Sequence, residues 1–148
     1  MRAALALFAS VLLNAAPALA QDAGVPDAMR VAWDEVAPHV EPARAAVVTV
    51  ALGTAGAHHG PLSAQRLWAR REAESRARRA LHAWLDEAIA HAAITPPAIA
   101  ALHQAIDEHA SVTATRARVD GSACIELIVP LSSLAACTPD VRGLPWSA

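Results

Sequence analysis

The sequence has no tyrosine and no lysine, and its only phenylalanine, Phe8, lies close to the first residue. A core of this chain therefore cannot rest on aromatic bulk and must use close contacts between alanine and aliphatic side chains. The length of 148 residues is typical of one domain, and the 55% content of apolar residues excludes a disordered chain.

There is also no excess of positive charge and no sequence motif of a common reaction. Twelve arginines are set against 14 acidic residues, for a net charge of −2, which gives no electrostatic reason to bind nucleic acid. The chain has no G-x-S-x-G elbow, no Gly-rich nucleotide loop and no H-E-x-x-H or C-x-x-C pattern. We therefore predict a protein that is not an enzyme and uses no cofactor, with a small hydrolase as an alternative.

The first residues have the pattern of a secretory signal peptide. A basic Met1-Arg2 start precedes an apolar run over 3–13, and Pro17-Ala18-Leu19-Ala20 then offers small residues where signal peptidase requires them. We predict that residues 1–20 are removed by cleavage after Ala20. Because no cysteine lies near this point and no later stretch reaches transmembrane length, we expect a periplasmic or secreted, soluble protein without a lipid anchor or transmembrane segment.

Only two cysteines occur, Cys124 and Cys137. In an oxidising compartment such a pair predicts one disulfide, which would close a short loop and add about 2–3 kcal/mol of stability. Two free thiols and a bond between chains are the alternatives, and catalysis by cysteine lacks a local signature.

Composition divides the chain after the leader into a Pro-rich acidic segment over 21–44, an α+β domain over 45–137 and a broken tail over 138–148. Apolar residues at helical spacing in the first segment predict a short helix that ends at the prolines. These residues are Met29, Trp33, Val36 and Val40.

The predicted α+β domain begins with a β-branched strand over 45–52, followed by a Gly-rich loop that carries His58-His59. A long helix over 63–93 comes next, with alanines recurring on one face, so that it can lie close to a sheet. A second helix over 95–110 starts at Thr95-Pro96, after a connection short enough for an antiparallel pair.

Asp120-Gly121-Ser122 lies between two strand-like segments and predicts a hairpin over 112–129. A three-residue loop with Gly121 in the left-handed region keeps Arg116 and Arg118 off the apolar face, where burial would be costly. The residues expected on the apolar face are Thr113, Thr115, Ala117, Val119, Ile125, Leu127 and Val129. The expected fold is a small antiparallel sheet, made of the first strand and the hairpin, packed against the long helix.

Histidine and aspartate recur at helical spacing on both predicted helices. His82 and Asp86 lie on the first helix, and His103 and Asp107 lie on the second. In an antiparallel pair Asp86 is level with His103, and His82 is level with Asp107. Such a cluster could hold Zn²⁺ or Cu²⁺ if the two faces converge, and a solvated face with ordinary ion pairs is the alternative. His58-His59 form a second metal candidate, in a loop.

The order of these elements over residues 45–136 resembles the LPP-twenty-like lipoprotein group and the N-terminal domain of the flagellar assembly protein T. The resemblance implies a small α+β module of the cell envelope without catalysis, tied to outer-membrane or flagellar basal-body assemblies. The residues that carry it are Ala51-Leu52-Gly53-Thr54-Ala55-Gly56, the helical alanines Ala69, Ala73, Ala77 and Ala80-Leu81, Asp120-Gly121, and Val129-Pro130-Leu131.

We therefore expect an exported, non-enzymatic module that binds another envelope protein, with a periplasmic metal-binding protein as the alternative. Trp33, Trp146 and the arginines of the long helix are candidates for the contact surface. These arginines, interleaved with glutamates, favour a solvated face, and an acidic partner or lipid headgroups are the alternative. They are Arg66, Arg70, Arg71, Arg76, Arg78 and Arg79.

Overall fold

The structure is a computed structural model that describes residues 34–57 and 60–147. The described residues cluster as one compact unit. The predicted signal peptide, Trp33 and His58-His59 lie outside the described residues.

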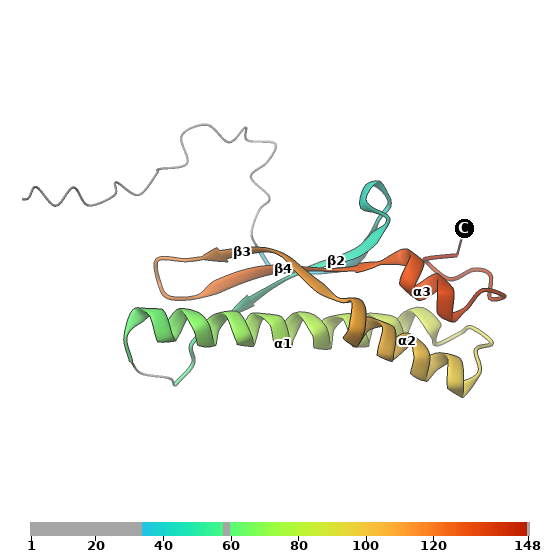
Figure 1. Cartoon of the computed structure of the whole chain (residues 1–148), viewed down its shortest axis with the longest axis horizontal. Coiled ribbons are helices and arrows are strands. Elements are labelled where there is room, and N and C mark those ends of the chain that lie inside the picture. The colour runs from blue at the N-terminus through green and yellow to red at the C-terminus, as the bar shows by residue number, and fades with distance from the viewer. Residues whose placement is uncertain (1–33, 58–59, 148) are drawn as a thin grey trace, which may run out of the picture. The chain divides into compact units, whose positions relative to one another are not determined.

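Four antiparallel strands form one sheet in the order β1-β2-β4-β3. The two central strands are β2 (Ala46–Gly53) and β4 (Ala123–Pro130), and the edges are β1 (Val36–Glu41) and β3 (Ser111–Ala117). The chain adds a short 3-10 turn, η2 (Pro42–Arg44), between β1 and β2. The sheet packs on three helices, so the predicted α+β fold is confirmed (Figure 1).

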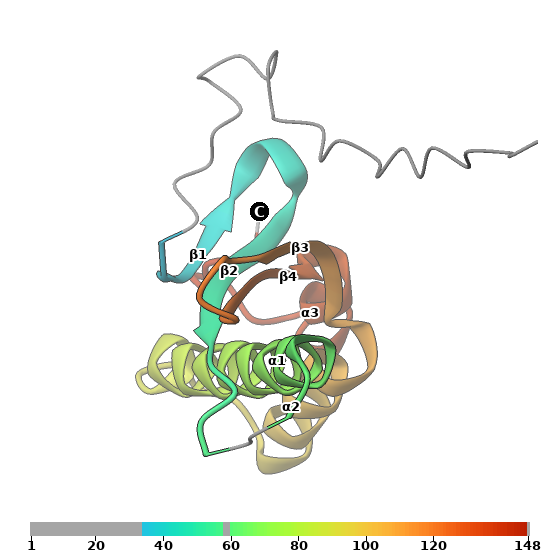
Figure 2. The same ribbon diagram turned by 90° about the vertical axis from the view of Figure 1, so that its left-hand side faces the viewer.

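The long helix α1 (Leu62–Ile89) crosses one face of the sheet and buries every fourth residue (Figures 1 and 2). The buried residues are Ala69, Ala73, Ala77, Leu81, Leu85 and Ile89. Alanine is used where the helix touches the sheet most closely. A Cβ atom built on Gly53 would lie 2.0 Å from the carbonyl oxygen of Ala69 and 2.3 Å from the nitrogen of Ala73. The predicted alanine-mediated contact therefore includes direct backbone contact between helix and sheet.

A second helix, α2 (Pro96–His109), runs back beside α1, and a short third helix, α3 (Leu131–Cys137), packs against α2. Thr95 precedes α2 at the cap position, and Pro96 begins the helix, as the sequence predicts. Figure 2 shows α2 on the side of α1 that faces away from the sheet. The order strand, long helix, helix, strand, strand is confirmed.

The β3–β4 hairpin has the predicted side-chain parity near its loop. Thr115 pairs with Ile125 and Arg116 with Cys124, and Gly121 is left-handed with φ +82°. The three-residue loop is Val119-Asp120-Gly121, one position earlier than expected. The hydrogen bond that closes it runs from the Arg118 amide to the Ser122 carbonyl oxygen, at 2.8 Å.

A register irregularity in β3 reverses this parity farther along the strand. Between Val112 and Ala114 the pairing shifts, so that Val112 pairs with Leu127 and packs against the core. Thr113, Thr115 and Ala117 are exposed and Val119 is 100% exposed, so the prediction that these four side chains face inward to the core is wrong. The extra residue of a β-bulge explains Thr113, which lies on the other face beside Glu126. Val119 is exposed for a different reason, because it lies in the loop, which begins one position earlier than expected.

The part of the predicted short helix that lies within the described residues is also wrong, whereas Met29 lies outside them. Residues Val36–Glu41 form edge strand β1, paired with β2, although Val36 and Val40 are four positions apart. Pro38 explains the outcome, because proline inside a helix removes a hydrogen bond, whereas an irregular edge strand tolerates it. The β1–β2 pairing is irregular between Val36 and His39, on either side of this proline.

The predicted C-terminal tail packs against the helices. Trp146 is only 5% exposed, and its indole nitrogen donates to Thr138 Oγ1 at 3.0 Å. Its ring centre lies 5.8 Å from that of Trp84 on α1. Trp146 is therefore part of the core, and the prediction that it contributes to a contact surface is wrong.

Candidate functional site

The four predicted metal-ligand residues come together where α1 and α2 run side by side. His82 Nδ1 and His103 Nδ1 are 2.8 Å apart. His82 Nε2 lies 3.0 Å from Asp107 Oδ1, and His103 Nε2 lies 3.0 Å from Asp86 Oδ1. The predicted cross-helix levels, Asp86 with His103 and His82 with Asp107, are therefore what the structure shows.

These contacts form a chain of hydrogen bonds and do not surround a common point. In the described part of the chain, no group of three or more His, Cys, Asp or Glu side chains is arranged to hold a metal ion. Two imidazole nitrogens on one tetrahedral Zn²⁺, each at about 2.0–2.1 Å, would be about 3.3 Å apart, which exceeds the distance between the two Nδ1 atoms. Binding of a metal by these residues stays a prediction, and it requires the rings to move apart.

The predicted disulfide is wrong, since the structure shows no bond between Cys124 and Cys137. Cys124 is near the start of β4 and alternates with Ile125, which faces α1, so its side chain is on the opposite face of the sheet. Cys137 ends α3 on the helical side, where its thiol donates to the Ala101 carbonyl oxygen of α2. Most of β4, at about 3.3 Å per residue, separates the two positions, whereas a disulfide requires Cα atoms within about 7 Å.

The six arginines of α1 fall into two groups. Three of them have acceptors: Arg76 donates to Glu72 at 2.7 Å, Arg78 to Glu74 at 3.2 Å, and Arg79 to Ser75. Arg78 also reaches the carbonyl oxygens of Asp107 and Ala110.

The other three arginines lie near the beginning of α1. Arg66 and Arg70 are exposed and form no ion pair with any side chain in residues 34–57 and 60–147. The guanidinium of Arg71 lies 5.3 Å from the centre of the Trp68 ring, over its face. Leu67 is 49% exposed and Trp68 is 40% exposed. We call Leu67, Trp68, Arg70 and Arg71 the arginine–tryptophan face.

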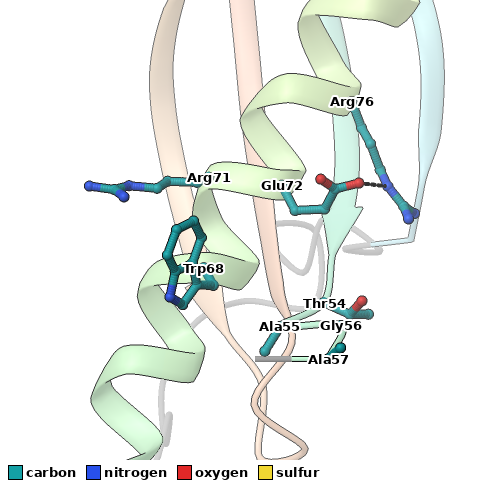
Figure 3. Close-up of a pocket in the computed structure, with 8 residues that line it drawn as sticks. All are labelled: Thr54, Ala55, Gly56, Ala57, Trp68, Arg71, Glu72 and Arg76. Carbon is teal, nitrogen blue, oxygen red and sulfur yellow. Dashed lines mark hydrogen bonds and ion pairs between the residues drawn. The ribbon is translucent and has the colours of Figure 1, made fainter. Parts of the chain in front are cut away.

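An open hollow of about 400 Å³ adjoins this face (Figure 3). One wall is formed by α1, and the other by the segment that follows β2. The lining residues are Thr54, Ala55, Gly56, Ala57, Trp68, Arg71, Glu72 and Arg76. Figure 3 shows the Glu72–Arg76 ion pair at the middle of the helical wall and Trp68 at one side. The side chain of Glu72 accepts from Arg76, which lowers the pKa of the carboxyl group.

Leu67 and Trp68 are not among the residues predicted from the sequence to form a contact surface. Neither residue belongs to the buried series that repeats every fourth residue from Ala69, so the helical periodicity of the sequence is enough to predict that both point away from the sheet. The hollow itself depends on the path of the segment after β2, for which the sequence contained no signal.

The face of the sheet opposite α1 carries one polar cluster. Glu126 on β4 accepts from Arg44 at 2.9 Å and from the Thr113 hydroxyl at 2.5 Å. The hydrogen bond from Arg44 lowers the pKa of Glu126, and the same contact raises the pKa of Arg44. This cluster joins η2, β3 and β4 and is structural.

No helix in the described part of the chain is both long and apolar enough to cross a bilayer. The chain matches no family model, no curated protein and no solved structure.

Proposed function

We propose that this chain is an exported, non-enzymatic envelope module, similar to the LPP-twenty-like group, that binds another envelope protein through its arginine–tryptophan face. The observation that carries the proposal is the exposure of Leu67 and Trp68 beside Arg66 and Arg70, which form no ion pair with any carboxylate of residues 34–57 and 60–147. Tryptophan and arginine are the residues most enriched among those that dominate binding energy at protein interfaces.

The charge of the face indicates the chemistry of the partner. Arg66, Arg70 and Arg71 occupy the first part of α1. The next two acids along the helix already have arginine partners, since Glu72 pairs with Arg76 and Glu74 pairs with Arg78. A segment with a carboxylate next to an apolar side chain would match both components of the face. Its carboxylate would take bidentate hydrogen bonds from a guanidinium, and its apolar group would cover Leu67 and Trp68.

The observed site does not favour chemistry on a small substrate. The hollow is open, and its acidic side chain, Glu72, is engaged in ion pairs. Such an arrangement suits contact with an extended surface better than exclusion of water from a reacting group.

The proposal is tested by photo-crosslinking in intact cells of the organism. A photoreactive amino acid at Leu67 is expected to yield one protein adduct that is lost in the double variant Arg70→Glu/Arg71→Glu. The matched controls are the same photoreactive residue at Ala100, which is exposed on α2, and the charge reversal Arg142→Glu, which is far from α1 in sequence. An adduct of equal strength from Ala100, or one that survives the double reversal, would contradict the proposed binding face.

A further inference from the structure

His82 on α1 and His103 on α2 direct the same ring nitrogen into one space between the two helices. Their Nδ1 atoms are 2.8 Å apart, and the ring centres are 5.1 Å apart with the ring planes inclined by 18°. Two stacked ring faces cannot approach this closely, because atoms in van der Waals contact lie about 3.5 Å apart. The rings therefore meet edge to edge, with both Nδ1 atoms at the point where they meet.

The other nitrogen of each ring is held by a carboxylate of the opposite helix. His82 Nε2 lies 3.0 Å from Asp107 Oδ1, and His103 Nε2 lies 3.0 Å from Asp86 Oδ1. An ionised carboxylate can only accept, so each contact places the hydrogen of a neutral imidazole on Nε2 and leaves the lone pair on Nδ1. A histidine that binds a metal ion commonly has this arrangement, in which a carboxylate on the second nitrogen fixes the tautomer and the direction of the ring.

The histidine pair is open to solvent. The side chains of His82 and His103 are 29% and 30% exposed. An open hollow of about 370 Å³ on α1 reaches His82, and its other lining residues are Arg71, Glu74, Ser75, Arg78 and Arg79. An ion and its coordinated water therefore have a path to the two Nδ1 atoms.

The charges around the pair are compatible with a bound cation. The carboxylates of Asp86 and Asp107 lie directly on the two rings. Arg78 donates to the carbonyl oxygen of Asp107, and its own charge is paired with Glu74. Arg79 is directed toward Ser75 and lies within 3.8 Å of a carboxylate oxygen of α1. Both neighbouring arginines thus have acceptors of their own.

We propose that His82 and His103 bind one divalent transition-metal ion of the kind that prefers imidazole, Zn²⁺ or Cu²⁺, through their Nδ1 atoms. Asp86 and Asp107 are then positioning residues that orient the rings, whereas the sequence suggests them as ligands. In residues 34–57 and 60–147 no group of three ligand side chains is in place, so water completes the coordination. For a tetrahedral ion, the two nitrogens must separate from 2.8 Å to about 3.3 Å.

The proposed metal site is separate from the arginine–tryptophan face. His82 follows Arg71 by 11 positions on the same helix, which is about 16 Å along its axis. Loss of metal binding would therefore leave the proposed crosslink at Leu67 in place, and loss of the crosslink would not affect the metal site.

Isothermal titration of residues 21–148 with Zn²⁺ and, separately, with Cu²⁺ tests the site. The background variant is His58→Ala/His59→Ala, which removes the other histidine pair, and we expect it to bind one ion per chain. In this background His82→Ala and His103→Ala should each weaken binding by at least about tenfold, whereas the exposed control His91→Ala should change it by less than about twofold. The ion that binds more tightly is assigned to the site, and we expect Cu²⁺. No binding in the background variant, or equal affinity in all three histidine variants, would overturn the proposal.

Nitrogen NMR on the unmodified chain, labelled with ¹⁵N-histidine, identifies the ligand atoms without depending on the folding of a variant. One equivalent of Zn²⁺ should shift the Nδ1 signals of His82 and His103, while their Nε2 atoms stay protonated and the signals of His91 stay in place. Zn²⁺ bound through Nε2, or a shift at His91 as large as at the pair, would contradict the site.

Asp86→Ala tests the positioning role of the carboxylates. We expect about tenfold weaker binding of Zn²⁺, because the ring of His103 loses the acceptor that fixes its tautomer. The Nε2 signal of His103 should then shift with Zn²⁺ as well, since either nitrogen can coordinate. The matched control is Glu87→Ala, at the next exposed position of α1, which should change the affinity by less than about twofold. Equal affinities in the two variants, with His103 still bound through Nδ1 alone, would show that Asp86 does not position the ring.

Discussion

The two halves of helix α1 make different contacts. In the first half, the backbone and alanine side chains lie directly on the sheet, where Gly53 has no Cβ that would obstruct the contact. In the second half, larger aliphatic side chains are buried instead, and His82 adds polar contacts with His103 and Asp107 of α2. Close contact through alanine fails when volume is added, whereas contact through larger side chains is weakened when a side chain is shortened.

Gly53→Ala is expected to have the largest effect on the first half. The new Cβ would meet backbone atoms of Ala69 and Ala73, which cannot rotate away. We expect a loss of about 3 kcal/mol or more in the free energy of unfolding, measured by urea denaturation. Gly56→Ala is the control: its φ of +57° is strained for alanine, but nothing lies within 4 Å, so about 1 kcal/mol is expected. An equal loss of unfolding free energy in the two variants would contradict the close contact between Gly53 and α1.

Ala73→Leu tests the same contact through a side chain. Ala73 is 0% exposed against the sheet, so extra methyl groups should cost about 2–3 kcal/mol. Ala83→Leu places the same group on an exposed position of the same helix and should change stability by less than about 0.5 kcal/mol. The melting temperatures of both variants are compared with that of the wild type. If Ala73→Leu melts at the wild-type temperature, Ala73 is not in close contact with the sheet.

Glu126→Gln tests how much the ion pair between Arg44 and Glu126 contributes to the free energy of unfolding at different pH values. The pKa of Glu126 is lowered by Arg44, so its contribution to stability is present above the unfolded value of about 4.3 and is lost as pH falls through the folded pKa. We expect the variant to lose about 1–2 kcal/mol at pH 7, with the difference from wild type shrinking below about pH 4. Urea denaturation at pH 7 and pH 3.5 measures both values. A difference that persists unchanged at pH 3.5 would contradict the ion pair.

Reduction is expected to have the smallest effect. Because Cys124 and Cys137 lie on opposite sides of the sheet, treatment with a reductant should not change the melting temperature. Mass spectrometry of the alkylated protein should show two modified thiols without prior reduction. A mass two units lower that shifts on reduction would restore the disulfide predicted from the sequence.

The sequence predicted those parts of the fold that depend on local pattern. The alanines of α1, the Thr95-Pro96 start of α2 and the left-handed Gly121 follow from spacing, capping and turn chemistry. The facing of His82 with His103 was accessible for the same reason, since an antiparallel helix pair fixes the levels of its residues.

The parts that failed depend on contacts distant in sequence. Val36 and Val40 have helical spacing, but β1 forms because the edge of β2 is available for pairing. The bulge that exposes Thr113 has no signal in the sequence. Trp146 lies in a tail broken by proline and glycine, and only the position of Trp84 and Thr138 explains its burial.

Hydrogen exchange followed residue by residue, in the wild type and in Ala73→Leu, tests most directly the central claim that close alanine contact holds the first half of α1 on the sheet. We expect the opening free energies of the amides from Ala69 to Ala77 to fall by about 2–3 kcal/mol in the variant. Opening free energies that stay unchanged over Ala69 to Ala77 would contradict the account.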